Sequence, residues 1–387
     1  MPAVVLKPGK HRRLMAGHCW VYEGEIASIS DDAQDGDAVE VFDHRKRCLG
    51  VGLLNRRSQI VVRLFSRRSE PLGREFFRQR LLCAAKRRVP AAAQRLVFSE
   101  ADLLPGLIVD KYGDCFVMQV LTLGLDQRKA MLVELLLELF RPAVVVERSD
   151  VSTRKCEGLR EVKAVLFGEP PVRREVEFGG VRFVVDLLED QKTGFYLDQV
   201  ENHVEVARHC AGKRVLDCFC YHGAFALHAA KAGAASVEGI EISESAVVRA
   251  RENAALNGFS DRVVFECANA FDVLKRYDAG KRRFDVIVLD PPTFTRTKQN
   301  VDDAVRGYKE INLRALKMLP PGGLLATFTC SHHVGADLFR DIVADAAADA
   351  RKTVRVVKTL TQASDHPVLV GVPETEYLKG LLLEVIG

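Results

Sequence analysis

Two polar segments that follow apolar runs carry residue types capable of covalent chemistry. The run Phe284–Leu289 leads directly into Asp290-Pro291-Pro292, and the run Leu324–Thr329 leads into Cys330. Near-continuous apolar runs are typical of parallel strands that are buried on both faces. The carboxyl ends of such strands share one edge of a sheet, where ligands bind. The sequence therefore predicts that Asp290 and Cys330 face the same bound molecule.

A cysteine in this position suits the modification of an unreactive carbon. Carbon 5 of a pyrimidine is such an atom, and a thiolate that adds to carbon 6 makes it nucleophilic enough to take a methyl group. Asp290 can hydrogen-bond the edge of the base, and either it or a water can remove the proton from carbon 5. The two prolines stiffen this loop because each fixes its own φ.

Two other interpretations of these segments stay open. A cysteine at a strand end is more often a small core residue than a nucleophile. The sequence Asp-Pro-Pro also occurs in enzymes that methylate exocyclic amines, where the base is adenine or guanine and no cysteine takes part. The ten cysteines contain no Cys-x-x-Cys pair. We predict no metal site, although Cys330, His332 and His333 form the one cluster that resembles metal ligands.

Residues 214–241 indicate which cofactor lies at this edge. They are predicted to form a strand, a tight loop, a helix and a second strand, which is one βαβ unit of a doubly wound sheet. A dinucleotide site needs three glycines, but Asp217 and Phe219 replace two of them and only Gly223 remains. An acidic loop repels a pyrophosphate and suits a cation. S-adenosylmethionine fits, with Asp217 facing its amino-acid end and Glu241 accepting both ribose hydroxyls.

Two further segments supply candidate contacts to the adenine of that cofactor. Thr193-Gly194 is predicted to form a loop before a helix, and Phe195 can stack on the adenine ring. Asn269-Ala270 follows another strand, and an asparagine offers both a donor and an acceptor to the adenine edge. An ordinary buried βαβ unit with acids at its strand ends by chance is the competing interpretation of residues 214–241.

Composition limits the class of protein. A chain of 387 residues predicts two or three domains. No apolar run is long enough to cross a membrane, and the dispersed cysteines fit a protein of the reducing cytoplasm better than a disulfide scaffold. We expect a cytoplasmic protein that has no membrane partner.

The basic excess is confined to the first part of the chain. Residues 1–68 contain 12 Lys/Arg and 8 Asp/Glu, whereas the remainder contains 44 of each. This part also alternates like short strands separated by basic loops. A small β-barrel with basic loops suits contacts to an RNA backbone. A solvated face without a partner explains the charge equally well, and Trp20 can be either a base-stacking or a core residue.

The expected elements follow from hydrophobic periodicity. Strands are predicted at residues 4–7, 38–42, 48–54, 59–65, 144–147, 175–178, 215–216, 237–240, 263–266, 284–289 and 324–329, with two more joined by a turn at 112–114. Helices are predicted at residues 69–90, 126–140, 224–231, 245–257 and 303–318, with one more after residue 200.

Several longer motifs resemble those of one known family. They are Gly17-His-Cys-Trp-Val-Tyr, Glu100-Ala-Asp-Leu-Leu-Pro-Gly, Gln191-Lys-Thr-Gly-Phe-Tyr-Leu-Asp-Gln, Asp217-Cys-Phe-Cys-Tyr-His-Gly, Asp290-Pro-Pro-Thr-Phe, Thr329-Cys-Ser-His-His and Asp365-His-Pro-Val-Leu. Over nearly its whole length the chain resembles the bacterial large-subunit ribosomal RNA 5-methylcytosine methyltransferases with an N-terminal PUA domain. It departs from that family at Asn269, where Asp is commoner, and at Thr293, where Lys is commoner.

The resemblance implies an α/β fold in three domains. These are a β-barrel PUA domain at 1–70 that binds RNA, a central α+β domain at 71–183, and a Rossmann-like class I methyltransferase domain at 184–387. It further implies S-adenosylmethionine as methyl donor, ribosomal RNA as substrate, Cys330 as nucleophile and a homodimer. The candidate cofactor-binding residues are Thr193, Gly194, Phe195, Asp198, Asp217, Phe219, Gly223, Glu241, Asn269, Ala270, Asp290 and Pro291.

Three alternative functions remain at this point. An RNA methyltransferase acting on an exocyclic amine of a purine would not need Cys330. A non-catalytic RNA-binding assembly factor on the same fold would tolerate changes at Asp217 and Glu241. A nicotinamide-dependent oxidoreductase is disfavoured by the missing glycines.

Overall fold

A computed structural model describes residues 1–169, 173–294 and 300–387. The chain divides into two compact units. The first comprises Met1–Val176, Val185–Leu197 and Asp365–Glu376, and the second comprises Glu177–Val184, Asp198–Ser364 and Tyr377–Gly387. The predicted boundary near residue 70 lies within the first unit, so the three-domain division stays a prediction.

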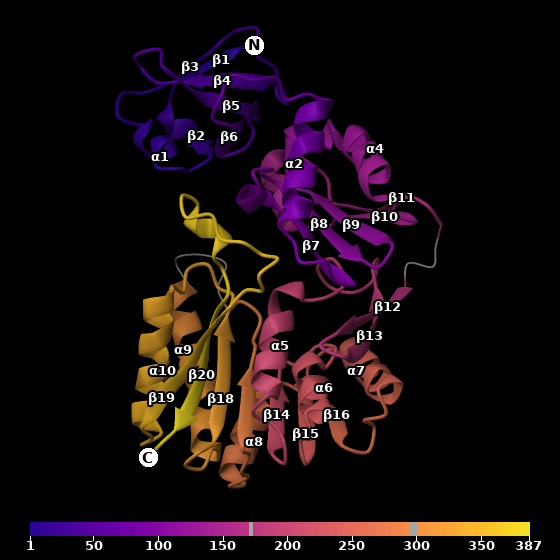
Figure 1. Ribbon diagram of the computed structural model, residues 1–387. Coiled ribbons are helices and arrows are strands. Elements are labelled where there is room, and N and C mark those ends of the chain that lie inside the picture. Colours follow the sequence, from indigo (N-terminus) through magenta and orange to yellow (C-terminus); the bar gives the residue numbers. More distant parts are fainter. Residues whose placement is uncertain (170–172, 295–299) are drawn as a thin grey trace. The chain divides into compact units, whose positions relative to one another are not determined.

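The N-terminal domain of the first unit is a six-stranded sheet in the order β2-β6-β5-β4-β1-β3 (Figure 1). Its elements are β1 Ala3–Leu6, α1 Arg12–Met15, β2 Trp20–Tyr22, β3 Ile26–Ile29, β4 Ala38–Phe42, β5 Cys48–Leu54 and β6 Ile60–Ser66. Apolar residues such as Val4, Val41 and Val62 fill its core. Strands β4 and β5 have the predicted bounds, whereas α1, β2 and β3 were not predicted.

Trp20 packs against the apolar core of the N-terminal domain, and base stacking by its ring stays a prediction. It is half-buried, and its indole N–H donates to Glu100 of the central domain at 2.9 Å. Buried or partly buried indoles usually find such a partner. Trp20 therefore connects the two domains of the first unit.

The central domain has a five-stranded sheet in the order β11-β10-β9-β8-β7. Its elements are α2 Arg74–Lys86, β7 Ala93–Phe98, β8 Leu107–Tyr112, β9 Cys115–Val120, α3 Leu123–Asp126, α4 Lys129–Phe140, β10 Val144–Ser149 and β11 Val162–Phe167. The helix predicted at 126–140 is divided between α3 and α4, and the helix predicted at 69–90 is longer at both ends than α2. The residue before a proline avoids the helical region, so α2 ends before Pro90.

Strand β7 was missed because its polar residues are buried. Gln94 and Arg95 break the apolar pattern, but the Arg95 guanidinium pairs with Asp110 through two hydrogen bonds of 2.8 Å. Asp110 is completely buried on β8. A long-range charge pair thus explains a strand that local periodicity cannot reveal. Two further strands, β12 Arg173–Phe178 and β13 Val181–Asp186, form a separate two-stranded sheet.

The second unit is built on a seven-stranded sheet in the order β16-β15-β14-β17-β18-β20-β19. Its strands are β14 Arg214–Cys218, β15 Ser236–Glu241, β16 Val263–Cys267, β17 Val286–Leu289, β18 Leu324–Thr329, β19 Val354–Thr361 and β20 Lys379–Val385. The first five pair in parallel, and β20 runs antiparallel between β18 and β19.

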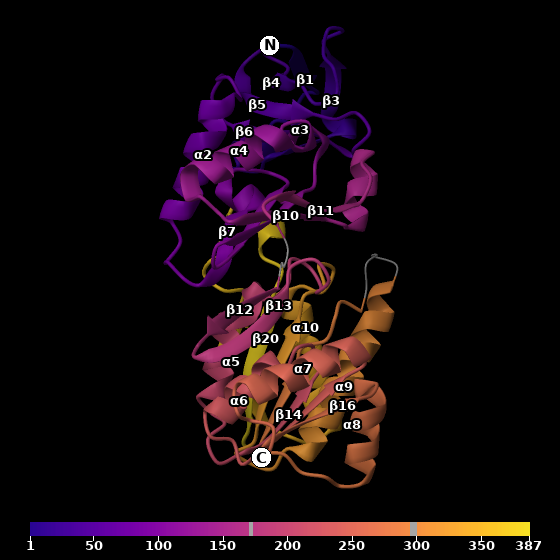
Figure 2. The same cartoon turned by 90° about the vertical axis from the view of Figure 1, so that its right-hand side faces the viewer.

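Helices cover both faces of this sheet (Figure 2). The helices are α5 Val200–Ala207, α6 Ala224–Lys231, α7 Glu244–Leu256, α8 Ala270–Ala279, α9 Val301–Met318 and α10 Ala336–Asp349. Helices α8, α9 and α10 pack over one apolar core with the sheet, and α5, α6 and α7 lie on the other face. The doubly wound fold is as expected, while α8, α10, β19 and β20 were not predicted. No helix in the described ranges has the length and apolar character needed to span a bilayer.

Candidate active site

Parallel pairing aligns the carboxyl ends of the five parallel strands in the second unit. Cys218 on β14 is opposite Leu289 on β17, and Leu289 is opposite Thr327 on β18. Asp290 follows β17 by one residue, and Cys330 follows β18 by one. Both strand ends therefore reach the same edge of the sheet. The Asp290 and Cys330 side chains are half-buried there.

Asp217 lies on β14 at this edge and is completely buried. One carboxylate oxygen accepts the backbone N–H of Ala226, at the start of α6, at 2.9 Å. The other oxygen has no hydrogen-bond partner among the described residues. Burial is the main reason why the pKa of Asp217 lies well above its usual range, and the negative charges of Asp290 and Glu241 raise that pKa further.

Glu241 ends β15 and organises the loop that follows β14. Its two oxygens accept three backbone N–H groups at 2.9–3.0 Å, from Tyr221, Ile242 and Ser243. Phe219 and Tyr221 in that loop have φ of 65° and 47°. A left-handed backbone is strained for residues with a side chain. The bond from Tyr221 to Glu241 holds this conformation in place.

Gly223 allows the turn from that loop into α6. Its φ is 79°, and a Cβ added here would lie 2.7 Å from the ring of Phe265 on β16. The position therefore has neither the backbone conformation nor the space for a larger residue. The predicted turn at Gly223 is confirmed, although the physical reason includes packing as well as backbone freedom.

Phe219 and Asn269 have structural partners in the second unit. The Phe219 ring packs edge-on against Phe271 and Phe294 with centroids 6.3 and 6.5 Å apart. Asn269 caps α8, because its side-chain oxygen accepts the N–H of Phe271 at 2.9 Å. Ala270 is buried in the first turn of α8, and Pro291 is buried after β17. The cofactor contacts assigned to these residues stay predictions.

A chain of hydroxyl groups connects the two loops that carry Asp290 and Cys330. Thr293 shares a hydrogen bond with Ser331 at 2.8 Å, and Ser331 shares another with Tyr308 on α9 at 2.9 Å. Thr329 donates to the Tyr308 hydroxyl at 2.8 Å. Thr329 and Ser331 flank Cys330, so the chain fixes the cysteine relative to the Asp-Pro-Pro loop.

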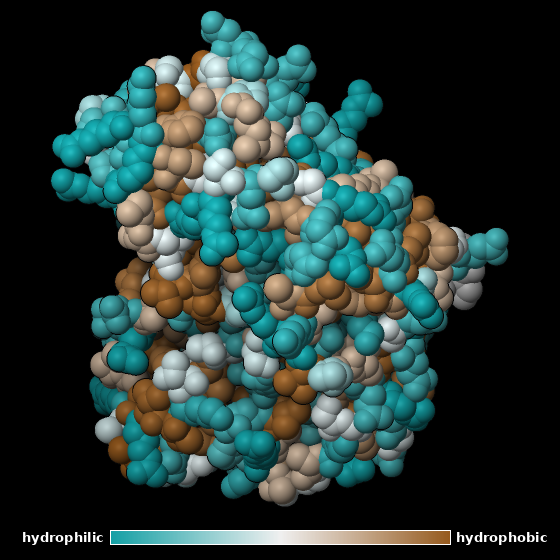
Figure 3. Space-filling model, turned by 45° about the horizontal axis from the view of Figure 1, so that its top comes forward, coloured by the Kyte–Doolittle hydropathy of each residue, from teal (hydrophilic) through white to brown (hydrophobic). Residues whose placement is uncertain are grey.

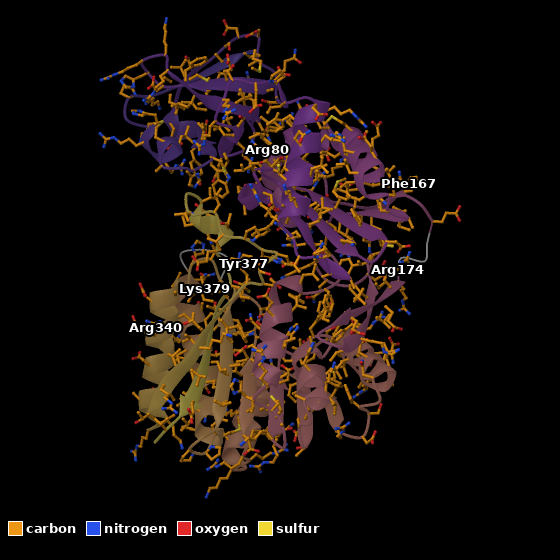
Figure 4. All side chains as sticks on the ribbon, viewed as in Figure 1. Arg80, Phe167, Arg174, Arg340, Tyr377 and Lys379 are labelled. Atoms are coloured by element: carbon orange, nitrogen blue, oxygen red, sulfur yellow. The ribbon has the colours of Figure 1, made fainter. Side chains whose placement is uncertain are left out.

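Strand β20 adds a cation to this cluster. Lys379 donates to the carbonyl of Ser331 at 3.0 Å, and Figure 4 shows Lys379 near Tyr377 at the start of β20. Sequence reasoning missed Tyr308 because it occupies a buried position of an amphipathic helix, where it resembles a core residue. Tyr308 also lies in none of the sequence motifs, because its hydrogen bonds join residues that are far apart in the chain.

The remaining predicted residues divide between the two units. Asp198 belongs to the second unit, where the Tyr377 hydroxyl donates to its carboxylate at 2.6 Å. Thr193, Gly194 and Phe195 belong to the first unit. Thr193 donates to Asp110 at 2.5 Å, and the Phe195 N–H donates to Tyr112 at 3.1 Å. These bonds explain how the loop is held, and its contact with a cofactor stays a prediction.

The charges of the second unit fit a cationic ligand. Glu241 and Asp290 lie near enough to Asp217 for their charges to raise its pKa. A pyrophosphate would be repelled by three carboxylates, whereas a sulfonium or ammonium group would be stabilised. One oxygen of Asp217 lacks a partner in the described chain, which leaves an acceptor for such a group.

Comparison with known proteins agrees with this geometry. Residues 156–383 match the family of S-adenosylmethionine-dependent methyltransferases, and residues 4–67 match a PUA-like domain. The "Ribosomal RNA large subunit methyltransferase I" of Shewanella denitrificans is 43% identical over 392 residues and covers 99% of both chains. The chain belongs to this methyltransferase family. The protein of the same name from Alteromonas mediterranea is 39% identical over 390 residues, covering 99% of this chain and 98% of its own.

A solved structure supports the same fold for this member of the methyltransferase family. A methyltransferase complexed with SAH has a TM-score of 0.86 at 20% identity and covers 100% of each chain. Family membership confirms the expected S-adenosylmethionine dependence and the PUA-like domain. It also excludes the oxidoreductase alternative, in agreement with the missing glycines.

Proposed function

We propose that this methyltransferase transfers a methyl group to carbon 5 of a cytosine in large-subunit ribosomal RNA. The observation that carries the proposal is the position of Cys330 beside the Asp290 loop, at the carboxyl ends of neighbouring parallel strands. The names of the full-length relatives support ribosomal RNA as substrate. A half-buried cysteine that is fixed by hydroxyl groups on both sides suits a nucleophile better than a packing residue.

Each group then has a defined task. S-adenosylmethionine supplies a methyl group on a positively charged sulfur, and Asp217, Glu241 and Asp290 stabilise that charge. The Cys330 thiol would lose its proton to water, and its sulfur would form a bond to carbon 6 of the cytosine, which shifts the electron pair of the ring double bond to carbon 5. Carbon 5 would use this pair to bond the methyl group, whose bond to the sulfonium sulfur breaks and leaves S-adenosylhomocysteine. Asp290, or a water beside it, removes the proton from carbon 5, the bond from sulfur to carbon 6 breaks, and the ring double bond is restored.

The first unit is proposed to bind the RNA through its N-terminal domain, where the basic excess lies. Residues 1–70 would form this domain, 71–183 the central domain and 184–387 the methyltransferase domain. Thr193, Gly194 and Phe195 are proposed to contact the cofactor with Asp198. We also propose a homodimer on the basis of the family resemblance, which sedimentation of the purified chain would test.

Substitution of Cys330 tests the covalent mechanism. The Cys330→Ala protein should bind S-adenosylmethionine as the wild type does but should form no 5-methylcytidine, because it has lost the group that activates carbon 5. The measurement is transfer of labelled methyl to unmodified total RNA and to isolated ribosomal particles, followed by nucleoside analysis.

Cys267→Ala is the matched control, since Cys267 lies on β16 and is also not fully buried. Undiminished methylation by Cys330→Ala would refute the cysteine mechanism. A labelled amine of adenine or guanine in the wild-type reaction would favour the exocyclic-amine alternative and reduce Cys330 to a packing residue.

A further inference from the structure

The N-terminal domain contains a cavity that the mechanism does not use. It has a volume of about 560 Å³ and is lined by two loops, the one after β1 and the one after β4. Strands β1 and β4 pair in parallel, with Val5 opposite Phe42, so both loops leave the same edge of the sheet. The parallel pairing is thus the reason why segments about 35 residues apart form one site. The volume is in the range of small-ligand sites.

The lining of this cavity is strongly basic. It includes the exposed side chains of Arg12, Arg45 and Arg47 together with two histidines, His11 and His44. The two imidazole rings have centroids 5.8 Å apart. On the face that Figure 3 shows, hydrophilic side chains gather along the outer edge of the N-terminal domain. Such a concentration of cations attracts an anion.

One carboxylate lines the cavity, but its charge is already neutralised. Asp43 accepts the backbone N–H groups of Arg45 and Arg47, both at 2.9 Å, and pairs with the Arg47 side chain at 3.2 Å. Asp43 therefore shapes the turn and does not repel an anionic ligand. No ion pair in the described residues involves Arg12 or Arg45. Nδ1 of His11 is buried and has no hydrogen-bond partner in the described chain.

Other basic residues of this domain are occupied by structural contacts. Arg13 pairs with Glu25, Arg56 with Asp35, and Arg63 with Glu157. Arg67 is directed inward and donates to the carbonyl of His18 at 2.7 Å. The basic loops of this domain, which the sequence does not distinguish, therefore differ in how many of their cations are already paired. The loops after β1 and β4 line a cavity with Arg12 and Arg45, which have no ion-pair partner among the described residues.

We propose that this cavity binds one nucleotide of the RNA substrate, with the phosphodiester on Arg12 and Arg45. The unpartnered nitrogen of His11 offers a hydrogen bond to a phosphate or ribose oxygen. The proposal deepens the function proposed above, because it rests on RNA being the substrate and specifies which groups of the N-terminal domain recognise it. Arg47 supports the site by holding Asp43.

Binding of a labelled single-stranded RNA of mixed sequence to the full chain, without S-adenosylmethionine, tests this proposal. The variant Arg12→Ala/Arg45→Ala removes two charges from the cavity. The control variant Lys46→Ala/Arg57→Ala removes two exposed charges of the same domain that do not line it. The cavity variant should lose about tenfold in affinity, and its log–log salt dependence should fall by about 1.4. The control should keep both values, and Arg12→Lys/Arg45→Lys should retain most of the affinity.

Three outcomes would overturn the proposal. An equal loss of affinity in the cavity and control variants would indicate diffuse charge only. No loss in either variant would also overturn it. Tight binding of adenosine 5′-monophosphate that displaces no RNA would assign the cavity to free nucleotides. Thermal unfolding of each variant checks that it folds. The assay contains no methyl donor, so its result is independent of whether Cys330 or carbon 5 takes part in the reaction.

Discussion

Individual residues at the carboxyl edge of the second unit were partly predictable. Asp217 could be identified from its sequence alone, because an acid replaces a glycine at the end of a strand. Its complete burial, its bond to Ala226 and its raised pKa could not, since they depend on packing, on a backbone N–H of α6 and on the charges of Asp290 and Glu241. Asn269 shows the same limit, because the residue chosen for an adenine contact also caps a helix.

Asp217 should reduce the stability of the protein when no cofactor is bound. Its folded-state pKa lies above the unfolded value of about 3.9, so the folded chain holds this proton more tightly. The contribution of Asp217 to stability is thus fully present below pH of about 4 and is lost as pH rises through the folded-state pKa.

At neutral pH the free energy of unfolding of Asp217→Asn should therefore exceed that of the wild type by about 1–2 kcal/mol. Urea titration would measure this difference. The difference should shrink toward acid pH, and affinity for S-adenosylmethionine should fall at least tenfold, as isothermal titration would measure. Equal or lower stability of the variant at neutral pH would show that a partner neutralises Asp217 in the folded state.

At the scale of elements, the ends of strands could be predicted from the sequence, but the contacts that other elements make with those ends could not. Strand β18 has the predicted bounds, and Cys330 follows it as expected. The apolar run is a local signal, so sequence sufficed there. The contacts from Tyr308 to Thr329 and Ser331 join α9 to β18 across the chain and leave no local pattern.

Loss of the Tyr308 hydroxyl should slow catalysis and leave cofactor binding intact. Tyr308→Phe removes the centre of the hydroxyl chain and leaves Thr329 and Ser331 short of a partner, which costs about 1–2 kcal/mol of stability. We expect kcat to fall about tenfold with little change in KM for S-adenosylmethionine, because Cys330 is less well positioned.

Tyr277→Phe provides a matched control, since its hydroxyl donates to Glu238 at 3.0 Å, away from the strand ends. Equal losses of kcat in both variants would mean that Tyr308 acts through general stability. The rate at which Cys330 reacts with iodoacetamide gives a second readout that a purely structural role would not change.

At the scale of the whole molecule, the path of the chain could not be predicted. The segment Asp365–Glu376 belongs to the first unit, although the residues before and after it belong to the second. Within the first unit, Asp365 accepts the N–H of Arg95 at 2.7 Å, and Gly371 lies against the backbone of Gly17. The motifs around Gly17 and Asp365 are distant in sequence, and their resemblance to a family did not reveal that they meet.

A methyl group at Gly371 should loosen this segment. A Cβ there would lie 2.6–2.8 Å from backbone atoms of Gly17, which cannot move as a side chain can. We expect Gly371→Ala to increase the rate of limited proteolysis within residues 365–376 and to lower the melting temperature. Gly24→Ala is the control, because nothing lies within 4 Å of its added Cβ. Unchanged proteolysis of Gly371→Ala would show that the contact adapts.

Strand β20 lies between β18 and β19 although both precede it in the chain. During synthesis on the ribosome, β19 emerges before the strand that must separate it from β18. The edge of β18 therefore stays unpaired until residues up to Val385 have been made, and an apolar strand with open hydrogen-bonding groups is a template for aggregation. For this protein the vulnerable period in the cell is the interval between the translation of Thr329 and that of Val385, and chaperones that cover exposed strands should matter most then.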